Sequence, residues 1–428
     1  KSYFTTSNVT QKATNYWNGA SEDVQMDGNT LVIDMAQEYG PIAKTLFEKN
    51  SEFEPEFIAN QMNKVKTAPE GENYPGAEGS EFYDMTGWSL PYAHNLKAWY
   101  SNETPSLTEG MSKEERGLPK AELGYIMRYD GEEDILAMAD LLADGVTASI
   151  TLSAMTLDGK QIPKGSFVMF KSRNSSDLPE KLIAVMKSRN VNFEALTTSY
   201  PDSGREGPGN RLGGLTAPKI GVIFGNGAQL TSVSGLWYTM DHVFKLPYTA
   251  LSGGAVGNAT MLAQYSVIVA PSGSGILSNT KLKDWVREGG VVVVLGDSPS
   301  SVATFSNGSE TRSIPGSLFK AQLEPRSLLS SGYAGTEISV PVDGSSFPKA
   351  RKEGGAVVKF ADADPKKLLT GWSWGEESEK ALNGAVWMHD EPVGQGHIVW
   401  FSQDPTDRAM WQGLHKLLLN SMILMPGN

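Results

Sequence analysis

The sequence predicts an α/β protein whose C-terminal half is an open parallel sheet flanked by helices. Three short apolar runs, at 219–224, 265–270 and 291–295, are typical of strands buried on both faces of such a sheet. Helical patterns at 235–244 and 278–288 separate them. This alternation of strands and helices favours a parallel arrangement with right-handed crossovers.

The same domain continues to the C-terminus, so we assign it to residues 214–428. Another strand is predicted at 397–401, and a closing helix at 406–422. Between about 300 and 385 the pattern becomes irregular and rich in Ser, Gly and Pro, with strand candidates at 336–342 and 356–360. We interpret this stretch as a β insertion into the α/β domain.

Two smaller α/β units are predicted ahead of this domain. Residues 1–27 are polar and predict a connector, with a helix around 9–18. The first unit, 28–120, has a strand at 30–35 followed by a helix at 40–47.

The second unit covers residues 121–213. Its strands are predicted at 124–128 and 166–170, and its helices at 132–143 and 178–186. The acidic residues in the first turn of 132–143 favour a helix start there, because they complement the helix dipole.

Composition excludes several kinds of chemistry. The 428 residues include no cysteine and five histidines, and the formal net charge is −12. Disulfides, thiolate metal sites and a cysteine nucleophile are therefore excluded. The acidic balance argues against nucleic acid as a partner, and no apolar run approaches the ~20 residues needed to span a bilayer.

Weak catalytic and metal-binding signals each have an ordinary alternative. His389, with Asp390 and Glu391, is the only local cluster that could hold a cation, and an exposed turn before Pro392 is the favoured alternative. The sequence Ala-Pro-Ser-Gly-Ser-Gly, which contains Ser272 and Ser274, follows a strand as a nucleophile elbow does, yet it lacks the leading glycine. A flexible strand-to-helix turn is the alternative.

A phosphate-binding loop is the third weak signal. Gly225-Asn-Gly227 follows the predicted strand 219–224, and glycines allow backbone N–H groups to approach an anion. The third glycine of a nucleotide-binding fingerprint is absent, so an ordinary turn remains the alternative.

A ligand would be expected at the carboxyl ends of the parallel strands, because open α/β sheets form their crevice there. Polar side chains follow four predicted strands and could together bind a small polar ligand, although each could equally be a turn or helix-cap residue. They are Asn226, Ser272, Asp297, Ser298, Gln403 and Asp404.

Aromatic side chains gather in the segment 82–100. Exposed aromatics can stack on sugar rings, so Trp88, Tyr92, Trp99 and Tyr100 could form a carbohydrate-binding surface. Aromatic residues of globular proteins also often belong to the core, and this alternative stays open.

The eleven residues Tyr-Asp-Met-Thr-Gly-Trp-Ser-Leu-Pro-Tyr-Ala at 83–93 resemble a segment downstream of the peptidase domain in large bacterial zinc carboxypeptidase-like proteins. Residues 31–47, the sequence Pro-Gly-Ser-Leu at 315–318 and the tail 394–405 followed by Arg408 are similar to other parts of the same region. The likeness is patchy but extends over nearly the whole chain.

The resemblance implies a non-catalytic accessory region of an exported protein, in the periplasm or outside the cell. Zinc would belong to an upstream peptidase domain, since no position here matches the family's zinc ligands. The C-terminal domain would resemble a glutamine amidotransferase or flavodoxin in fold only, because amidotransferase chemistry needs the cysteine that is lacking. Expected partners are the upstream peptidase domain and a small polar ligand or peptide; a stand-alone ligand-binding module and a serine hydrolase are the alternatives.

Overall fold

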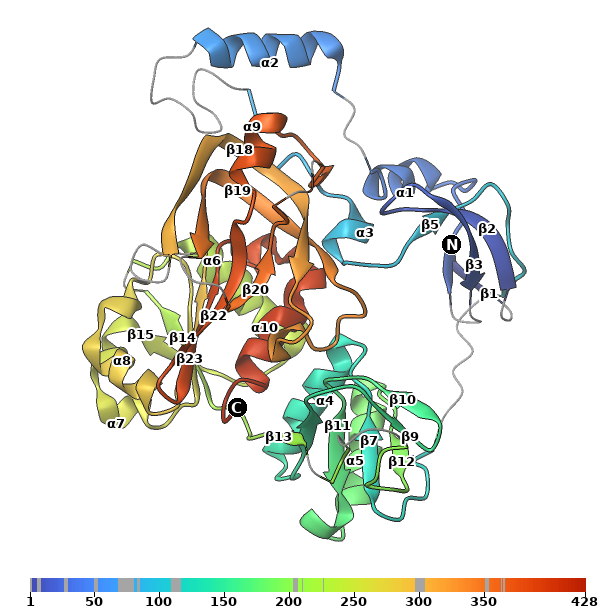
Figure 1. The fold of residues 1–428 in the computed structure, drawn as a ribbon, viewed down its shortest axis with the longest axis vertical. Coiled ribbons are helices and arrows are strands. Elements are labelled where there is room, and N and C mark those ends of the chain that lie inside the picture. The colour runs from blue at the N-terminus through green and yellow to red at the C-terminus, as the bar shows by residue number, and fades with distance from the viewer. Residues whose placement is uncertain are drawn as a thin grey trace.

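The C-terminal half of the molecule is built on one ten-stranded mixed sheet, which the smaller N-terminal and middle units flank (Figure 1). The computed structural model describes residues 2–5, 9–26, 30–49, 53–67, 81–82, 85–108, 117–202, 207–209, 211–225, 227–296, 305–350, 354–362, 364 and 366–428.

Half of the large sheet is parallel, as the apolar runs predict. Its strands are, in spatial order, β15 (Thr249–Ser252), β14 (Ile220–Phe224), β16 (Val267–Ala270), β17 (Val291–Leu295) and β23 (Gly396–Phe401). Every neighbouring pair among these five is parallel. Numbered along the chain, the order is 2-1-3-4-5, which is a doubly wound arrangement with its switch point between β14 and β16.

Helices cover both faces of the parallel strands. On one face α7 (Ala259–Leu262) and α8 (Thr280–Arg287) pack on alternate strand residues such as Val292 and Val294. On the other face α6 (Leu230–Tyr238) and α10 (His415–Ile423) belong to the larger core that includes Val291 and Val293. Asn279 caps α8 by accepting hydrogen bonds from two backbone N–H groups, as a helix start at 278–288 predicts.

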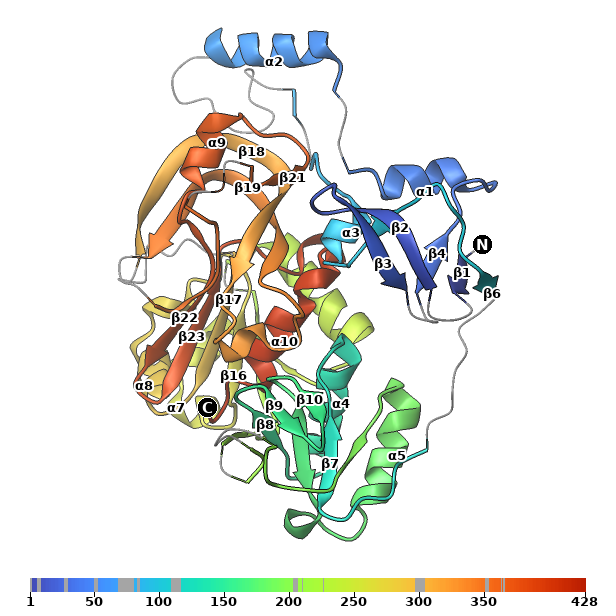
Figure 2. The same cartoon turned by 45° about the vertical axis from the view of Figure 1, so that its right-hand side comes forward.

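The predicted β insertion extends the same sheet with antiparallel strands. These are β22 (Val386–Val393), β20 (Ala356–Lys359), β18 (Phe305–Leu323) and β19 (Glu337–Ala350), with β21 (Leu368–Thr370) pairing to β18. Strands β18 and β19 form a long arm that rises beyond the carboxyl ends of the parallel strands, with α9 (Glu376–Ala381) beside it (Figure 2). The α/β class with an inserted β structure is thus confirmed.

The middle unit has an antiparallel sheet of five strands in the order β12-β7-β11-β8-β13, and a separate hairpin formed by β9 and β10. Both predicted helices and both predicted strands are found. The elements are β7 (Gly124–Met127), α4 (Glu132–Ala143), β8 (Ser149–Thr151), β9 (Met155–Leu157), β10 (Lys160–Ile162), β11 (Phe167–Phe170), α5 (Leu178–Arg189), β12 (Glu194–Leu196) and β13 (Leu212–Gly214).

The N-terminal segment corrects one prediction. Residues expected to form a helix around 9–18 are mostly strand β2, which pairs antiparallel with β3 and β5. The segment expected to be a connector therefore supplies strands to two three-stranded sheets. The elements of this unit are β1 (Ser2–Thr5), β2 (Val9–Asn15), β3 (Ser21–Met26), β4 (Leu31–Ile33), α1 (Gly40–Leu46), α2 (Pro55–Thr67), α3 (Leu90–Ala93), β5 (Trp99–Tyr100) and β6 (Leu107–Thr108).

The segment around α3 joins the N-terminal unit to the large sheet. The Tyr16 hydroxyl lies 2.6 Å from the buried Ser89 hydroxyl, and the Tyr16 and Tyr92 rings are 4.9 Å apart. On the other side, the Asn95 side chain accepts from the Ser339 backbone N–H (2.6 Å) and donates to its carbonyl (3.2 Å). The described part of the segment 83–93 is therefore a structural joint, whereas its residues 83 and 84 lie outside the described part of the chain.

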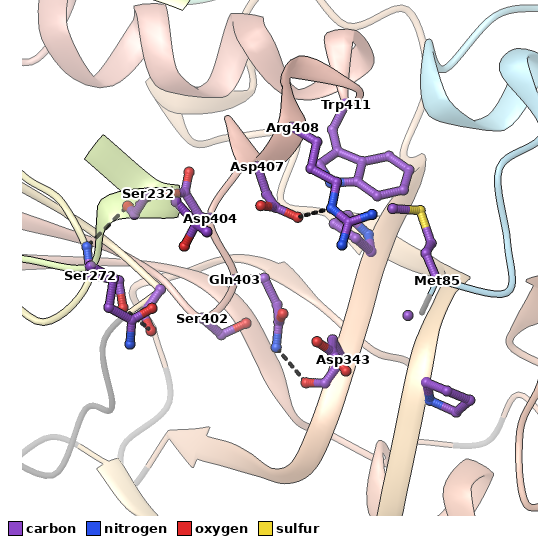
Figure 3. Close-up of a pocket in the computed structure, with 16 residues that line it drawn as sticks. Met85, Ser232, Ser272, Asp343, Ser402, Gln403, Asp404, Asp407, Arg408 and Trp411 are labelled. Carbon is purple, nitrogen blue, oxygen red and sulfur yellow. Dashed lines mark hydrogen bonds and ion pairs between the residues drawn. The ribbon is translucent and has the colours of Figure 1, made fainter. Parts of the chain in front are cut away.

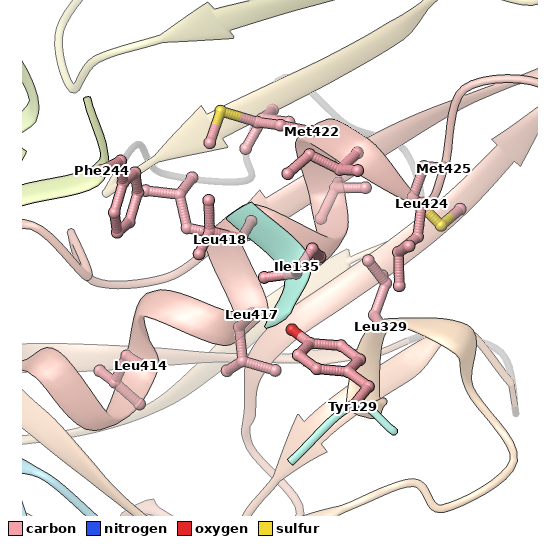
Figure 4. Packing of buried hydrophobic residues seen from close by; sticks show 14 of the residues in the cluster. Tyr129, Ile135, Phe244, Leu329, Leu414, Leu417, Leu418, Met422, Leu424 and Met425 are labelled. Atoms are coloured by element: carbon pink, nitrogen blue, oxygen red, sulfur yellow. The ribbon is translucent and has the colours of Figure 1, made fainter. Parts of the chain in front are cut away.

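The predicted closing helix is interrupted. Arg408 and Ala409 both have a φ of +53°, a left-handed conformation that a right-handed helix cannot contain. The continuous helix α10 therefore begins only at His415. Its buried residues fill the junction of the large sheet with the middle unit, together with Tyr129 and Ile135 (Figure 4).

Candidate functional site

A polar pocket lies at the carboxyl ends of the parallel strands. It has a volume of about 400 Å³, within the ~300–1,000 Å³ range of small-molecule sites. The loops after β16, β17 and β23 form its floor, α6 forms one wall, and Pro315, Gly316, Pro341 and Asp343 of the β18–β19 arm form the opposite wall (Figure 3). The pocket is therefore located where a doubly wound sheet predicts a ligand site.

Three of the six residues predicted for this site are brought together. Ser272, Gln403 and Asp404 all line the pocket. The other three candidates, Asn226, Asp297 and Ser298, lie outside the described residues.

Asp404 is the centre of a hydrogen-bond network beneath the pocket. Its Oδ1 accepts from the Thr406 backbone N–H (2.8 Å) and hydroxyl (2.7 Å), and its Oδ2 accepts from the Ser232 hydroxyl. The Ser232 hydroxyl in turn accepts from the Ser272 backbone N–H at 3.1 Å. The network thereby holds α6, the β16 turn and the β23 loop together.

Burial has a clear electrostatic effect on this carboxylate. Desolvation raises the pKa of Asp404 above its ordinary value, and the hydrogen bonds from Ser232 and Thr406 only partly oppose it. A perturbed acid within a polar pocket is a frequent mark of a functional site, although structural networks also perturb acids in this way.

The β18–β19 arm is tied to the strand ends. Gln403 Nε2 donates to the Asp343 carbonyl oxygen at 2.8 Å, which joins the β23 loop to β19 (Figure 3). The side chain of Asp343 lines the pocket beside that contact. The arm therefore belongs to the site and does not merely cover it.

Arg408 is the one basic residue among the described residues that line the pocket. Its Nε lies 4.0 Å from Oδ2 of Asp407, and its side chain is about half exposed, at 52%. Its left-handed φ, followed by the same conformation at Ala409, is uncommon for residues with a Cβ, and such backbone costs ~1–3 kcal/mol per residue. The turn thus presents a guanidinium beside the carboxylates of Asp343 and Asp407.

Sequence reasoning missed Ser232, Asp343 and Arg408. Ser232 lies inside α6 and Asp343 in the inserted arm, so neither directly follows a parallel strand. Arg408 falls within the predicted closing helix. A Ser and an Asp separated by more than 100 positions carry no local signal that they meet.

The serine-nucleophile interpretation requires a base beside Ser272 or Ser274, most often a histidine. None of the 16 described residues that line this pocket is a histidine. The Ser272 hydroxyl donates to the Gly296 carbonyl oxygen at 3.3 Å, and Ser274 is buried with 7% of its surface exposed. Gly273 and Gly275 have positive φ values, as expected of a tight turn.

The cation-site candidate at 389–391 does not converge on one point. Asp390 Oδ1 lies 2.8 Å from His397 Nδ1, whereas His389 is its buried neighbour on the same strand, whose side chain points to the other face. Among the described residues, no group of three or more His, Cys, Asp or Glu side chains is arranged to hold a metal ion.

The phosphate-loop candidate is only partly described. Gly225 and Gly227 both have positive φ, but the residue between them lies outside the described part.

The four aromatic residues suggested as a sugar-binding surface have different environments. Tyr92 is fully buried, while Trp88 and Tyr100 are 38% and 59% exposed. Trp99 lines a separate cleft.

Of the described helices, none has the length and apolar character to cross a membrane.

The fold and the site define an α/β protein with a doubly wound sheet and a polar pocket at its strand ends. Comparison with known protein families finds no match, and comparison with curated proteins finds none either. Solved structures resemble parts of the chain. One is a cytoplasmic protein of Salmonella typhimurium, with 13% identity over 48% of this chain and 99% of that one, and a TM-score of 0.31.

Two further solved structures show how varied the proteins are that resemble parts of this chain. A putative ThuA-like protein of Bacteroides uniformis has 9% identity over 47% of this chain and 89% of that one, with a TM-score of 0.31. A β-galactosidase of Bacillus circulans has 14% identity over 49% of this chain, with a TM-score of 0.29, and the match spans only 32% of the enzyme. Likeness at this level says nothing about activity.

Proposed function

We propose that this chain is a non-catalytic accessory region that binds a small polar ligand in the pocket at the strand ends. The observation that carries the proposal is the arrangement of that pocket: Asp343 and Asp407 beside the guanidinium of Arg408, above the network of Asp404. Charges of both signs suit a zwitterion, such as a free amino acid or the end of a short peptide, because its ammonium and carboxylate groups can each meet an opposite charge.

The broader setting of the proposal is an exported zinc carboxypeptidase-like protein. Its support is the resemblance of residues 83–93 to the region downstream of such peptidases. A ligand of amino-acid type agrees with this setting, since a carboxypeptidase releases free amino acids. Zinc would then be bound by the peptidase domain, and this chain would support or position that domain.

Thermal unfolding in the presence of candidate ligands tests the binding site. A ligand at 100 times its dissociation constant adds about 2.7 kcal/mol to the free energy of unfolding. We expect amino acids or dipeptides to raise the melting temperature, and Arg408→Ala to abolish the rise. Arg326→Ala is the matched control, because Arg326 is 90% exposed and, within the described part of the chain, pairs with Glu324 alone.

Two outcomes would contradict the proposal. If no amino acid, peptide, sugar or nucleotide shifts the transition, the pocket does not bind small polar ligands. If the purified chain with added zinc released C-terminal amino acids from peptides, the chain would be a peptidase itself. For the broader setting, we expect a His-x-x-Glu motif in the coding sequence ahead of residue 1, and its absence there would refute that part.

A further inference from the structure

A second and larger cavity lies between the N-terminal unit and the β18–β21 side of the large sheet. Its volume is about 1130 Å³, slightly above the ~300–1,000 Å³ typical of sites for single small molecules. One wall comes from the turn after β2 and from β5, and the opposite wall from residues 364–379. This inter-unit cleft is separate from the pocket at the strand ends and shares no lining residue with it.

The carboxylates of the cleft are already engaged. Asp364 and Glu337 lie 2.8 Å and 3.8 Å from Lys320 Nζ, and Glu376 lies 3.1 Å from Lys380 Nζ. The fourth, Glu379, accepts from the backbone N–H groups of residues 367 and 368 at 3.0 Å and 3.2 Å. Each of these acids therefore has an ion-pair or hydrogen-bond partner within the protein.

Three lysines of the cleft have no such partner. Among the described residues, no carboxylate lies within 4.0 Å of the ammonium groups of Lys49, Lys97 or Lys366, which all line the cavity. Partial burial and the nearby charge of Lys366 lower the pKa of Lys49. The described lining holds four lysines and four carboxylates, so its formal charge balances, and these three lysines are the ones that no carboxylate of the described residues contacts.

Two indole rings also line the cleft. Trp17 donates its ring N–H to the Leu96 carbonyl oxygen at 2.9 Å, and Trp99 donates its own to Glu22 Oε1 at 2.6 Å. Both side chains remain partly exposed and border the cleft. Because their only donors are used within the protein, what they offer to a ligand is flat apolar ring surface.

We propose that the inter-unit cleft binds an acidic oligosaccharide, a chain of sugar rings that bear carboxylates. Sugar rings have apolar C–H faces that pack against indole rings, and their carboxylates would pair with Lys49, Lys97 and Lys366. The volume suits more than one ring. A short acidic peptide would use the same lysines but would have no ring face to place on Trp17 and Trp99, and we therefore favour the saccharide.

Calorimetric titration of the whole chain with tri-galacturonate tests the proposal. We expect binding that weakens as salt is added, and none to an uncharged trisaccharide of the same size. Lys49→Gln and Lys366→Gln should each weaken binding about tenfold, the loss of one charge-assisted contact, and Trp99→Ala should weaken it to a similar degree. Lys281→Gln, an exposed lysine on α8, should leave it unchanged.

The outcomes separate the alternatives. No binding of tri-galacturonate at millimolar concentration, or binding that Lys49→Gln and Lys366→Gln do not weaken, would overturn the proposal. Equal binding of tri-glutamate with no effect of Trp99→Ala would also overturn it, in favour of an acidic peptide. Removing the charge of Lys49 relieves its repulsion from Lys366. A melting temperature of Lys49→Gln that is unchanged or raised would therefore show that lost binding is not lost folding. Arg408→Ala should not affect this binding, which distinguishes the cleft from the strand-end pocket.

Discussion

Replacing Gly235 by alanine tests how tightly α6 is held against the loop that carries the strand-end site. Gly235 is buried within the helix, where glycine is ordinarily a poor choice. A Cβ built on it would lie 2.4 Å from the carbonyl oxygen of Thr406 and 3.1 Å from the carbonyl carbon. Thr406 is the residue whose N–H and hydroxyl bind Asp404.

Two opposing terms set the size of the effect. Alanine is favoured over glycine in a helix interior by about 1 kcal/mol, so helix propensity alone predicts a gain in stability. Overpacking typically costs about 1–3 kcal/mol, and here the obstacle is backbone rather than a flexible side chain. We therefore expect Gly235→Ala to lower the free energy of unfolding by about 0–2 kcal/mol, the balance of the two terms, instead of raising it. Because Thr406 must move, ligand binding in the pocket should weaken too.

Urea unfolding followed by circular dichroism measures this difference. Ser234→Ala is the matched control, since Ser234 is the exposed neighbour on the same helix and its hydroxyl donates to the Leu230 carbonyl oxygen at 2.7 Å, within its own helix. The control should change stability by no more than about 0.5 kcal/mol. If Gly235→Ala instead gained the stability that helix propensity predicts, the close packing of α6 on the β23 loop would be wrong.

Three further predictions concern buried or paired polar groups. Asp404→Ala should destabilise the fold by about 2–4 kcal/mol in urea unfolding, because buried hydroxyl and N–H donors lose their acceptor; an unchanged midpoint would refute the network. The hydrogen bond to Asp390 raises the pKa of His397 above that of an unfolded histidine. The pair should therefore contribute its full stabilisation of the fold below the ordinary histidine pKa, and this stabilisation should be lost as the pH rises through the raised pKa of His397. Asp390→Asn should therefore cost more stability at pH ~5.5 than at pH ~8.5, and a cost that grows with pH would contradict this sign. Tyr129→Phe should lower the free energy of unfolding by about 1–3 kcal/mol, because the buried Tyr129 hydroxyl donates to Asn420 Oδ1 at 2.8 Å. An unchanged free energy of unfolding would show that this contact between the middle unit and α10 is dispensable.

The inner parallel strands could be predicted because each is buried on both faces, so its own sequence is mostly apolar. Val291–Leu295 is buried at every residue, so its side chains must be apolar on both faces, and such a run is visible without knowing its neighbours. Strand β15, Thr249–Ser252, is at the edge of the sheet and buries only Leu251, so its sequence carries almost no pattern. Edge strands are defined by the partner they pair with.

Errors arose where tertiary contacts outweigh local preference. Val9–Asn15 has no clear alternation of apolar residues, and its extended form follows from pairing on both sides with β3 and β5. The expected helix at 406–422 is broken by the left-handed turn at Arg408, a feature that periodicity cannot detect. The same turn places Arg408 at the pocket, so the mistake in the fold and the missed site residue have one cause.

The candidate site could be predicted only as far as the sheet itself determined it. Ser272, Gln403 and Asp404 follow parallel strands, and parallel strands present their carboxyl ends at one edge, so topology alone brings them together. Asp343 and Ser232 reach the same pocket by other routes, from the inserted arm and from a helix face.

The part of the chain with the most distinctive sequence serves as a joint, which explains why a motif need not mark a binding site. Within 88–95, Ser89 and Tyr92 are fully buried against the N-terminal unit, while Asn95 pairs with the backbone of β19. A joint between two units must satisfy buried polar groups from both sides, and only a few side chains meet that condition. The joint also fixes the distance between the two walls of the inter-unit cleft, since Trp17 and Trp99 belong to one unit and Lys366 to the other. Replacing Asn95, which does not itself line the cleft, should therefore alter binding there.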